Sequence, residues 1–324
     1  MTAAVDDEIV FNIVWTGRVF TYLRYFVASQ IAQTDARTRF RFVVNGCPPE
    51  QIDLLRAFRD RRPDRVVEVL VVSDEMGAHG VALDAAYEQR RDGDYFCFID
   101  PDILARGPFV RDFAASLDEG CAGVSSGRGV WRDDDVLPPG QLGVSGEYFY
   151  AADGYLFGSP HFAMYRRAPL DETRARWGVG FKSAGPDLSD EAKQRLDEIK
   201  RRFLVYDTGK LMNIFLQEEG NTLCHFEHPN LIHIGGLSHY LSPPDGGGGA
   251  EVADWSPDQT TWPWPVTRLE VARFTAAILR SLSEGHPAPA LPSGVDPAVA
   301  PRLEMVRSEL AALVNTYQAF VDGD

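Results

Sequence analysis

Basic charge, cysteine and long apolar runs are all scarce in this 324-residue chain. Lysine and arginine total 32 against 47 aspartates and glutamates, which gives a formal net charge of −15. Phosphate backbones and anionic lipid surfaces repel such a chain, so we expect it to bind neither nucleic acid nor a membrane. No apolar run approaches the roughly 18 residues that a membrane span needs. The N-terminal residues are acidic and lead directly into a strand-like run, so we expect a cytoplasmic protein.

The four cysteines, Cys47, Cys97, Cys121 and Cys224, form no C-x-x-C pair and lie mostly inside apolar stretches. A free cysteine packs as a small hydrophobic residue in such places. We therefore expect reduced thiols, in agreement with a cytoplasmic location. Two catalytic signatures are also missing from the sequence, the G-x-S-x-G turn and the G-x-x-x-x-G-K-[ST] phosphate loop. Their absence argues against the corresponding hydrolases and NTPases.

What is present in the first 100 residues is an alternation of short apolar runs and segments with helical periodicity. The apolar runs have the length and composition of strands buried on both faces, and they cover 9–15, 40–45, 66–72 and 95–99. Segments with helical spacing of apolar residues lie between them, over 18–33, from 48 onwards, and over 81–91. This alternation predicts an α/β fold with a mostly parallel, doubly wound sheet and helices on both faces.

The pattern changes after residue 108. Shorter elements and loops are expected there, namely a helix to about 118, a strand near 122–126, a long polar loop over 127–147, a strand-like run over 155–165 and a charged helix over 187–202. Residues 241–264 contain four consecutive glycines and a tryptophan-rich stretch, which predicts a flexible loop or lid. Two further helices, over roughly 265–283 and 300–321, form a helical C-terminal extension.

Two aspartates, Asp100 and Asp102, stand at the end of the fourth predicted strand, with Pro101 between them. Ligands of open α/β sheets bind outside the carboxyl ends of such strands. Two carboxylates one residue apart can supply oxygen ligands to a hard divalent cation, and that cation can neutralise a diphosphate. The alternative is a solvated turn, because Asp and Pro are both common in turns.

A second element carries His233 and His239 on either side of Gly235 and Gly236. Glycine backbone can approach a phosphate closely, and histidine is a common metal ligand. Either histidine alone could instead be a hydrogen-bonded structural residue. Together with the two aspartates, a histidine would leave open positions on Mn²⁺ or Mg²⁺ for diphosphate oxygens.

Four features follow one another over about residues 8–240. They are a strand and helix at 11–31, a glycine-containing loop, helix and D-x-D strand at 77–103, an apolar strand and a helix with acidic residues at 154–170 and 203–220, and an H-x-x-G element within 231–240. In this order they resemble the nucleotide-sugar-dependent glycosyltransferases of the GT-A fold.

The resemblance implies a metal site and a catalytic carboxylate. Asp100, Asp102 and His233 would hold Mn²⁺ or Mg²⁺, with Asp100 also beside the donor. His239 would face the diphosphate, where relatives of the glycogenin kind carry lysine. Asp207 would deprotonate the acceptor hydroxyl or stabilise the oxocarbenium-like centre. The alternative for Asp207 is a carboxylate that caps the helix after it.

The resemblance also implies contacts with the donor at two other places. His79 and Asp84 would touch its ribose or sugar, with a plain loop-to-helix turn as the alternative. Trp15, Thr16 and Arg18 follow the first strand, where the base and phosphates would sit. Trp15 could equally belong to the core.

The predicted reaction is the metal-dependent transfer of a sugar from a UDP-sugar or GDP-sugar to a hydroxyl of a small acceptor. The H-x-x-G element leans towards retention of configuration, and a homodimer is one assembly that this prediction allows. The predicted organisation is a glycosyltransferase domain at 1–240 with a donor half of about 1–125 and an acceptor half of about 126–240, the loop at 241–264, and the extension at 265–324.

The sequence also has to be compared with three other classes of protein. A haloacid-dehalogenase-like phosphatase also ends a strand in D-x-D, but after its first strand, and Leu104 stands where that family has Thr or Val. Nucleotidyltransferases usually open with a G-x-G-T-R loop, which does not follow Trp15. A non-catalytic protein on the same fold would bind a nucleotide sugar without turnover.

Overall fold

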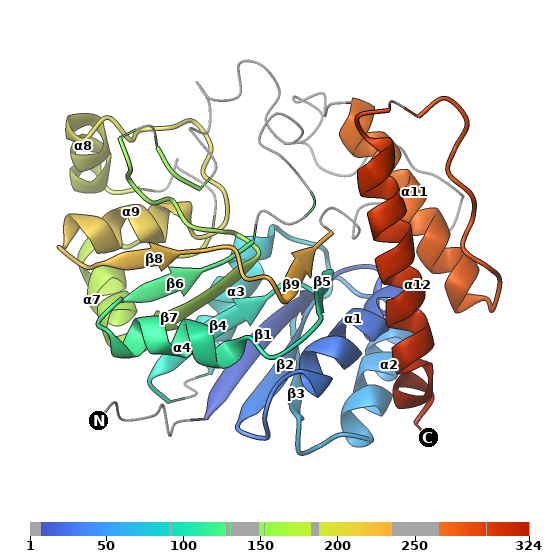
Figure 1. The fold of residues 1–324 in the computed structure, drawn as a ribbon. Helices are drawn as coiled ribbons and strands as arrows, with labels where there is room; N and C mark the ends of the chain where they lie inside the picture. The colour runs from blue at the N-terminus through green and yellow to red at the C-terminus, as the bar shows by residue number, and fades with distance from the viewer. Residues whose placement is uncertain are drawn as a thin grey trace.

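The fold was obtained as a computed structural model, which describes residues 8–90, 93–127, 130, 149–151, 153–182, 188–234, 266–295 and 297–323. Its centre is a seven-stranded sheet with the order β3-β2-β1-β4-β7-β6-β8, and a second sheet pairs β5 with β9 (Figure 1). The strands are β1 (Ile9–Trp15), β2 (Thr38–Asn45), β3 (Val66–Ser73), β4 (Tyr95–Ile99), β5 (Ile103–Ala105), β6 (Gly123–Ser125), β7 (Phe162–Arg166), β8 (Leu223–His225) and β9 (Leu231–His233).

Most of the central sheet is parallel. β1 pairs in parallel with β2 and β4, β2 pairs in parallel with β3, and β6 pairs in parallel with β8. β7 is antiparallel to both of its neighbours, β4 and β6. The mostly parallel α/β sheet predicted from the sequence is therefore confirmed. Because β7 runs the opposite way, the residue that precedes it lies at the edge where β4 ends.

Helices cover both faces of the sheet, as the sequence predicts. Their bounds are α1 (Phe20–Ala32), α2 (Pro49–Asp60), α3 (His79–Gln89), α4 (Val110–Asp118), α7 (Arg167–Trp177), α8 (Asp190–Glu198), α9 (Lys210–Glu218), α11 (Val266–Ser283) and α12 (Ala300–Asp322). Side chains of α1, α2, α4, α11 and α12 share one hydrophobic core, and those of α3, α7, α8 and α9 share another.

Successive side chains of β1 point to opposite faces of the sheet, so this strand contributes to both cores. Phe11 and Ile13 point into the layer of α1, whereas Val14 points into the layer of α3. All seven residues of β1 are buried, which requires the uninterrupted apolar run seen in the sequence. Each large apolar side chain buried in this way contributes roughly 1.5–3 kcal/mol.

The predicted C-terminal helices are present as α11 and α12. α12 packs against α1 and α11, and its Leu303 and Leu310 join the same core as β1. The Tyr25 hydroxyl on α1 donates a hydrogen bond to Gln318 Oε1 on α12, at 3.0 Å. The predicted loop at 241–264 and most of the predicted loop at 127–147 lie outside the described residues.

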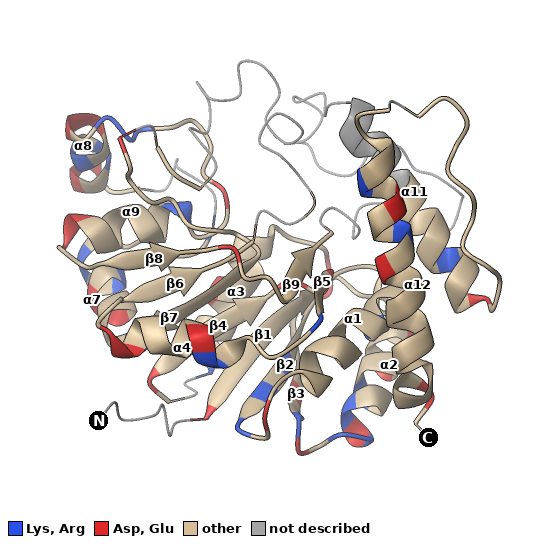
Figure 2. Ribbon diagram, viewed as in Figure 1, with Lys and Arg blue, Asp and Glu red and all other residues tan. Residues whose placement is uncertain are grey.

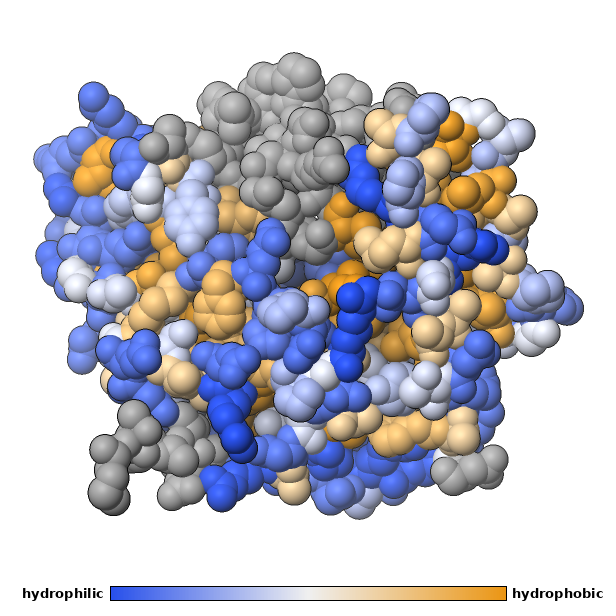
Figure 3. All heavy atoms as spheres, viewed as in Figure 1, coloured by the Kyte–Doolittle hydropathy of each residue, from blue (hydrophilic) through white to orange (hydrophobic). Residues whose placement is uncertain are grey.

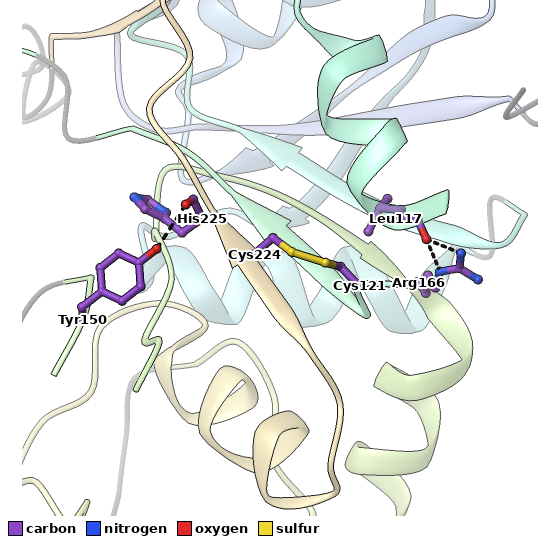
Figure 4. The surroundings of a disulfide bond; sticks show 6 residues. All are labelled: Leu117, Cys121, Tyr150, Arg166, Cys224 and His225. Atoms are coloured by element: carbon purple, nitrogen blue, oxygen red, sulfur yellow. Dashed lines mark hydrogen bonds between the residues drawn. A yellow bond between two sulfur atoms is a disulfide. The ribbon is translucent and has the colours of Figure 1, made fainter. Parts of the chain in front are cut away.

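One expectation about cysteine is wrong. Cys121 and Cys224 form a disulfide with an S–S distance of 2.07 Å (Figure 4). Cys224 belongs to β8, Cys121 lies two residues before β6, and the Cα atoms of the two cysteines are 6.4 Å apart. Cys47 and Cys97 are buried and form no disulfide, as expected. Disulfides persist mainly in oxidising compartments, so the cytoplasmic location stays a prediction that free thiols no longer support.

Charged side chains lie mainly on the outer helices and at the ends of strands (Figure 2). A buried exception is Arg41 on β2, whose guanidinium pairs with Glu68 at 3.0 Å and donates to Asn12 Oδ1 at 3.2 Å. Figure 3 shows hydrophilic residues over much of the surface, with apolar residues interspersed among them. Of the helices in the described part of the chain, none combines the length and apolar character of a membrane span.

Candidate functional site

Two carboxylates and two imidazoles meet at the edge of the sheet where β4 ends. Asp100 follows β4 directly, and Asp102 precedes β5. His161 precedes the antiparallel strand β7, and its carbonyl oxygen accepts a hydrogen bond from the Asp100 N–H at 2.8 Å. His233 ends β9, which pairs with β5 so that His233 lies opposite Ile103. Backbone pairing therefore brings these four side chains together from three separate segments.

The side chains of this cluster are in close contact. His161 Nδ1 lies 3.2 Å from Asp100 Oδ2, and His233 Nε2 lies 3.3 Å from Asp102 Oδ1 and 3.9 Å from Asp100 Oδ2. The two imidazole rings have centroids 3.9 Å apart. His79, the first residue of α3, approaches from the other side with Nε2 at 3.5 Å from Asp100 Oδ1. Asp100 is thus contacted by three histidines.

The cluster has the composition of a metal site. Asp100, His161 and His233 each offer one ligand atom, and these atoms all lie within 4.8 Å of one another. Asp102 adds a second carboxylate beside His233 and is itself buried. Oxygen and imidazole nitrogen donors together suit divalent cations such as Mn²⁺. Nδ1 of His233 is buried and has no hydrogen-bond partner among the described residues, so contacts through Nε2 and the ring hold this imidazole.

Electrostatics also favour a cation here. The pKa of Asp100 is raised to about 7, chiefly by burial; the neighbouring His79 and His233 act to lower it, and the charges of Asp102 and Asp207 act to raise it. Burial, followed by the neighbouring His233, holds the pKa of His161 well below its usual value. At neutral pH His161 is therefore an uncharged imidazole with a lone pair to donate. A bound cation would offset the repulsion among the carboxylates.

Asp207 lies close enough to act electrostatically on both Asp100 and His161. The alternative role as a helix cap is wrong, because the N-cap of α9 is Gly209, which has φ of 79° and receives no side-chain cap. The Asp207 carboxylate instead accepts a hydrogen bond from the neighbouring Thr208 N–H at 2.8 Å. Asp207 is therefore held as a half-buried charge near the cluster.

Trp15 and Arg18, two of the predicted donor contacts, lie in different settings. Trp15 is fully buried and packs edge-on against Phe20 and Phe42, at centroid distances of 5.0 and 5.7 Å. It has no surface for a nucleotide, so its predicted role in binding is corrected to a role in the core. Arg18 is exposed and forms an ion pair with Glu50 on α2.

Asp84 holds a turn rather than facing the cluster. Its two oxygens accept hydrogen bonds from the Phe181 and Lys182 N–H groups at 2.9 and 3.0 Å. Arg174 on α7 pairs with the same carboxylate at 2.6 Å. Asp84 therefore joins α3 to the chain after α7. Thr16 is half-buried just after β1, and His239 lies outside the described residues.

His161 is the residue of this cluster that the sequence prediction missed. Its signal was weak, since a single histidine in an apolar run reads as a core residue. Its proximity to Asp100 depends on the antiparallel pairing of β7 with β4, in which Phe162 lies opposite Ile99. Only a prediction of that pairing could have found it.

No family model and no curated protein matches the sequence. Among solved structures, the chain is similar to the mannosyltransferase PcManGT from Pyrobaculum calidifontis in complex with GDP-Man and Mn²⁺, at 13% identity, 98% coverage of this chain, 77% of that chain and a TM-score of 0.44. It is similar to S. aureus TarS in complex with UDP-GlcNAc, at 12% identity, 94% and 81% coverage and a TM-score of 0.43. It is also similar to a nucleoside-diphosphate-sugar pyrophosphorylase from Vibrio cholerae, at 14% identity, 69% and 95% coverage and a TM-score of 0.39. At such identities and TM-scores, function has to be argued from the residues of the site.

Proposed function

We propose that this chain is a glycosyltransferase that moves a sugar from a nucleoside diphosphate donor to a hydroxyl group of a small acceptor. The observation that carries the proposal is the contact of the D-x-D carboxylates with His233 at the end of β4. A cation site at that edge lies where open α/β sheets bind their ligands. The resemblance of the ordered motifs to GT-A glycosyltransferases supports the same reaction.

Asp100, Asp102 and His233 would hold the divalent cation, which when bound stabilises the charge of a departing diphosphate. His79 contacts Asp100 at 3.5 Å and so orients the carboxylate from the side of α3. Asp102 is buried and Asp100 is only partly exposed, and limited contact with water strengthens charge interactions at the site.

Asp207 is the residue proposed to act on the acceptor. Its carboxylate lies near the cluster without a role in capping α9. It would take the proton from the attacking hydroxyl, or stabilise positive charge at the sugar carbon as the donor bond breaks. Retention follows if the sugar is delivered to the face from which the diphosphate departs, and the anomeric configuration of the product decides this point.

The partners proposed are a UDP-sugar or GDP-sugar and a small hydroxylated acceptor. A formal net charge of −15 disfavours phosphate-rich polymers and anionic lipid surfaces as acceptors. A phosphatase of the haloacid dehalogenase kind is disfavoured because its D-x-D follows the first strand. In this chain β1 ends at Trp15, and the D-x-D follows β4.

The test is calorimetric titration of the purified protein with UDP, GDP, ADP and dTDP, each with Mn²⁺ and again with EDTA. We expect one diphosphate to bind with Mn²⁺ and not with EDTA. Asp102→Asn should abolish this binding, whereas Asp118→Asn, an exposed aspartate at the end of α4, should leave it unchanged. Cation-independent binding, or full binding by Asp102→Asn, would exclude the proposed site.

Binding must then be separated from turnover. Incubation of the protein with the matching nucleotide sugar and a panel of hydroxylated acceptors should release the nucleoside diphosphate and form a glycoside. Binding with no release in the presence of any acceptor would favour the non-catalytic alternative. Release of inorganic phosphate from phosphate esters would favour a phosphatase.

A further inference from the structure

We propose that His161 is a nitrogen ligand of the cation at this site, and that the site therefore selects a transition-metal ion such as Mn²⁺ over Mg²⁺. The inference deepens the proposed function and rests on its cation site. The D-x-D motif and His233 were expected from the sequence, whereas His161 enters through the tertiary structure alone. A second imidazole changes which metal the same carboxylates prefer.

The geometry places His161 within ligand range. Its ligand atom lies within 4.8 Å of those of Asp100 and His233. Two atoms bound to one cation at about 2.0–2.2 Å lie at most about 4.4 Å apart. The separations within the cluster are therefore close to those that a single ion requires.

Hydrogen bonds fix the backbone of His161, as the position of a metal ligand requires. Its N–H donates to Ser159 Oγ at 3.1 Å, and its carbonyl accepts from the Asp100 N–H at 2.8 Å. Ser159 is itself buried. The β4–β7 register continues this pairing into the sheet, with Phe162 opposite Ile99. The backbone hydrogen bond next to the β4–β7 pair thus holds His161 and Asp100 side by side.

The chemistry of the donors gives the selectivity. Mg²⁺ prefers oxygen ligands in regular octahedral geometry and gives up its waters reluctantly. Imidazole nitrogen suits Mn²⁺, Co²⁺ and Zn²⁺ better than it suits Mg²⁺. With His161 and His233 both coordinating, half of the four protein ligands would be nitrogen. A D-x-D site with a single histidine would discriminate less strongly.

The experiment measures metal binding without nucleotide or turnover. Tag-free protein is stripped with EDTA, dialysed, and titrated with Mn²⁺ or Mg²⁺ by calorimetry. We expect the wild type to bind Mn²⁺ more tightly than Mg²⁺. His161→Gln should weaken Mn²⁺ binding by about 10–100-fold, the loss found even for outer partners of metal ligands, and should change Mg²⁺ binding far less. His161→Asp should shift the preference towards Mg²⁺.

Spectroscopy separates a ligand from a residue that only orients Asp100. Pulsed electron paramagnetic resonance of the Mn²⁺-loaded wild type should detect nitrogen coupling from two imidazoles, and His161→Gln should retain one. His286→Gln changes an exposed histidine between α11 and α12 and serves as the matched control. Far-ultraviolet circular dichroism and the melting temperature confirm that each variant is folded.

The outcomes distinguish this inference from the proposed function. An unchanged Mn²⁺ to Mg²⁺ ratio with unchanged nitrogen coupling in folded His161→Gln would overturn the inference and leave the transferase proposal intact. Loss of one nitrogen coupling with no binding of any nucleoside diphosphate would support the inference and contradict the transferase. Wild-type protein that binds neither metal would overturn the inference, and turnover measured in EDTA would then decide the transferase separately.

Discussion

Asp207 is the single residue on which catalysis depends most directly in the proposed mechanism. Its half-buried carboxylate influences Asp100 and His161, yet it makes no cap for α9. A carboxylate next to a helix start would be expected to accept hydrogen bonds from the N–H groups of the helix, and one that caps no helix is available to act on an acceptor in the proposed mechanism. Proton transfer by a positioned carboxylate contributes about 10²–10⁴-fold to a rate.

Asp207→Asn should therefore lower kcat by about 10²–10⁴-fold while donor affinity changes little, since the amide keeps the volume and loses the base. The measurement is steady-state kinetics together with calorimetric donor binding. Asp197→Asn, an exposed change on α8, is the control. Normal turnover of Asp207→Asn would remove Asp207 from the mechanism.

Gly80 is a second residue whose identity is imposed by its surroundings. A Cβ at this position in α3 would lie 2.0 Å from the carbonyl oxygen of Phe181. That carbonyl cannot easily move, because it accepts from the Gly209 N–H and the Phe181 N–H donates to Asp84. The glycine thus permits the close approach of α3 to the turn that Asp84 holds.

Gly80→Ala should lower the free energy of unfolding by about 1–3 kcal/mol, the usual cost of overpacking, although alanine favours helix by about 1 kcal/mol. Urea denaturation measures the change. Gly77→Ala is the control, because a Cβ there would meet only Asn45 Oδ1 at an ordinary 3.5 Å. Equal stability of the two variants would show that the contact between α3 and Phe181 is looser than described.

At the scale of elements, the Cys121–Cys224 disulfide joins β8 to the segment just before β6 and closes a sequence separation of 103 residues. Cys224 precedes His225, whose Nδ1 lies 2.8 Å from Ser125 Oγ across the same strand pair. The Tyr150 hydroxyl donates to the His225 carbonyl at 3.1 Å (Figure 4). The disulfide lies towards the Arg166 end of β7, because the Arg166 N–H donates to the carbonyl of Ala122, the residue after Cys121 (Figure 4).

Reduction of the disulfide should be measurable by counting thiols. Denatured, unreduced protein should show two free thiols out of four cysteines, and all four after dithiothreitol. Cys121→Ser should lower the free energy of unfolding by about 2–4 kcal/mol, because the unfolded chain is no longer constrained by the cross-link. Cys47→Ser changes a cysteine outside the disulfide, so dithiothreitol should still expose two additional thiols in this variant. Four thiols before reduction would contradict the pairing.

At the scale of the whole molecule, the C-terminal helices and the first strand share one core. Leu310 on α12 is fully buried in the same cluster as Phe11 of β1, and the Tyr25–Gln318 hydrogen bond joins α1 to α12. Helices that share a core with the sheet should unfold together with it. The division of the chain at residue 265, between the loop at 241–264 and the helical extension, stays a prediction.

Leu310→Ala should therefore destabilise the whole molecule, by about 2–5 kcal/mol, in a single cooperative transition. Urea denaturation followed by both fluorescence and circular dichroism measures it. Leu54→Ala, at an exposed position of α2, should change stability by less than about 0.5 kcal/mol. A separate early transition in Leu310→Ala would instead identify 265–324 as an independently folding unit.

The parts of the fold and the site that could be predicted are those with local signals. The strand of residues 95–99 is apolar and stops at Asp-Pro-Asp, so its end and its two carboxylates follow from neighbouring residues alone. His161 and the Cys121–Cys224 pair could not be predicted in the same way. Their partners lie 61 and 103 residues away along the chain.

Periodicity and turn residues act over a few residues, and these local signals are enough to predict the alternation of strands and helices, the position of Asp100 and Asp102 at a strand end, and His233 as a candidate ligand. The burial of Trp15 in the core, the antiparallel direction of β7 and the contact of His161 with Asp100 become visible only in the folded chain. Strand order and direction depend on how both faces of the whole sheet are packed, and no short segment of the sequence contains that information.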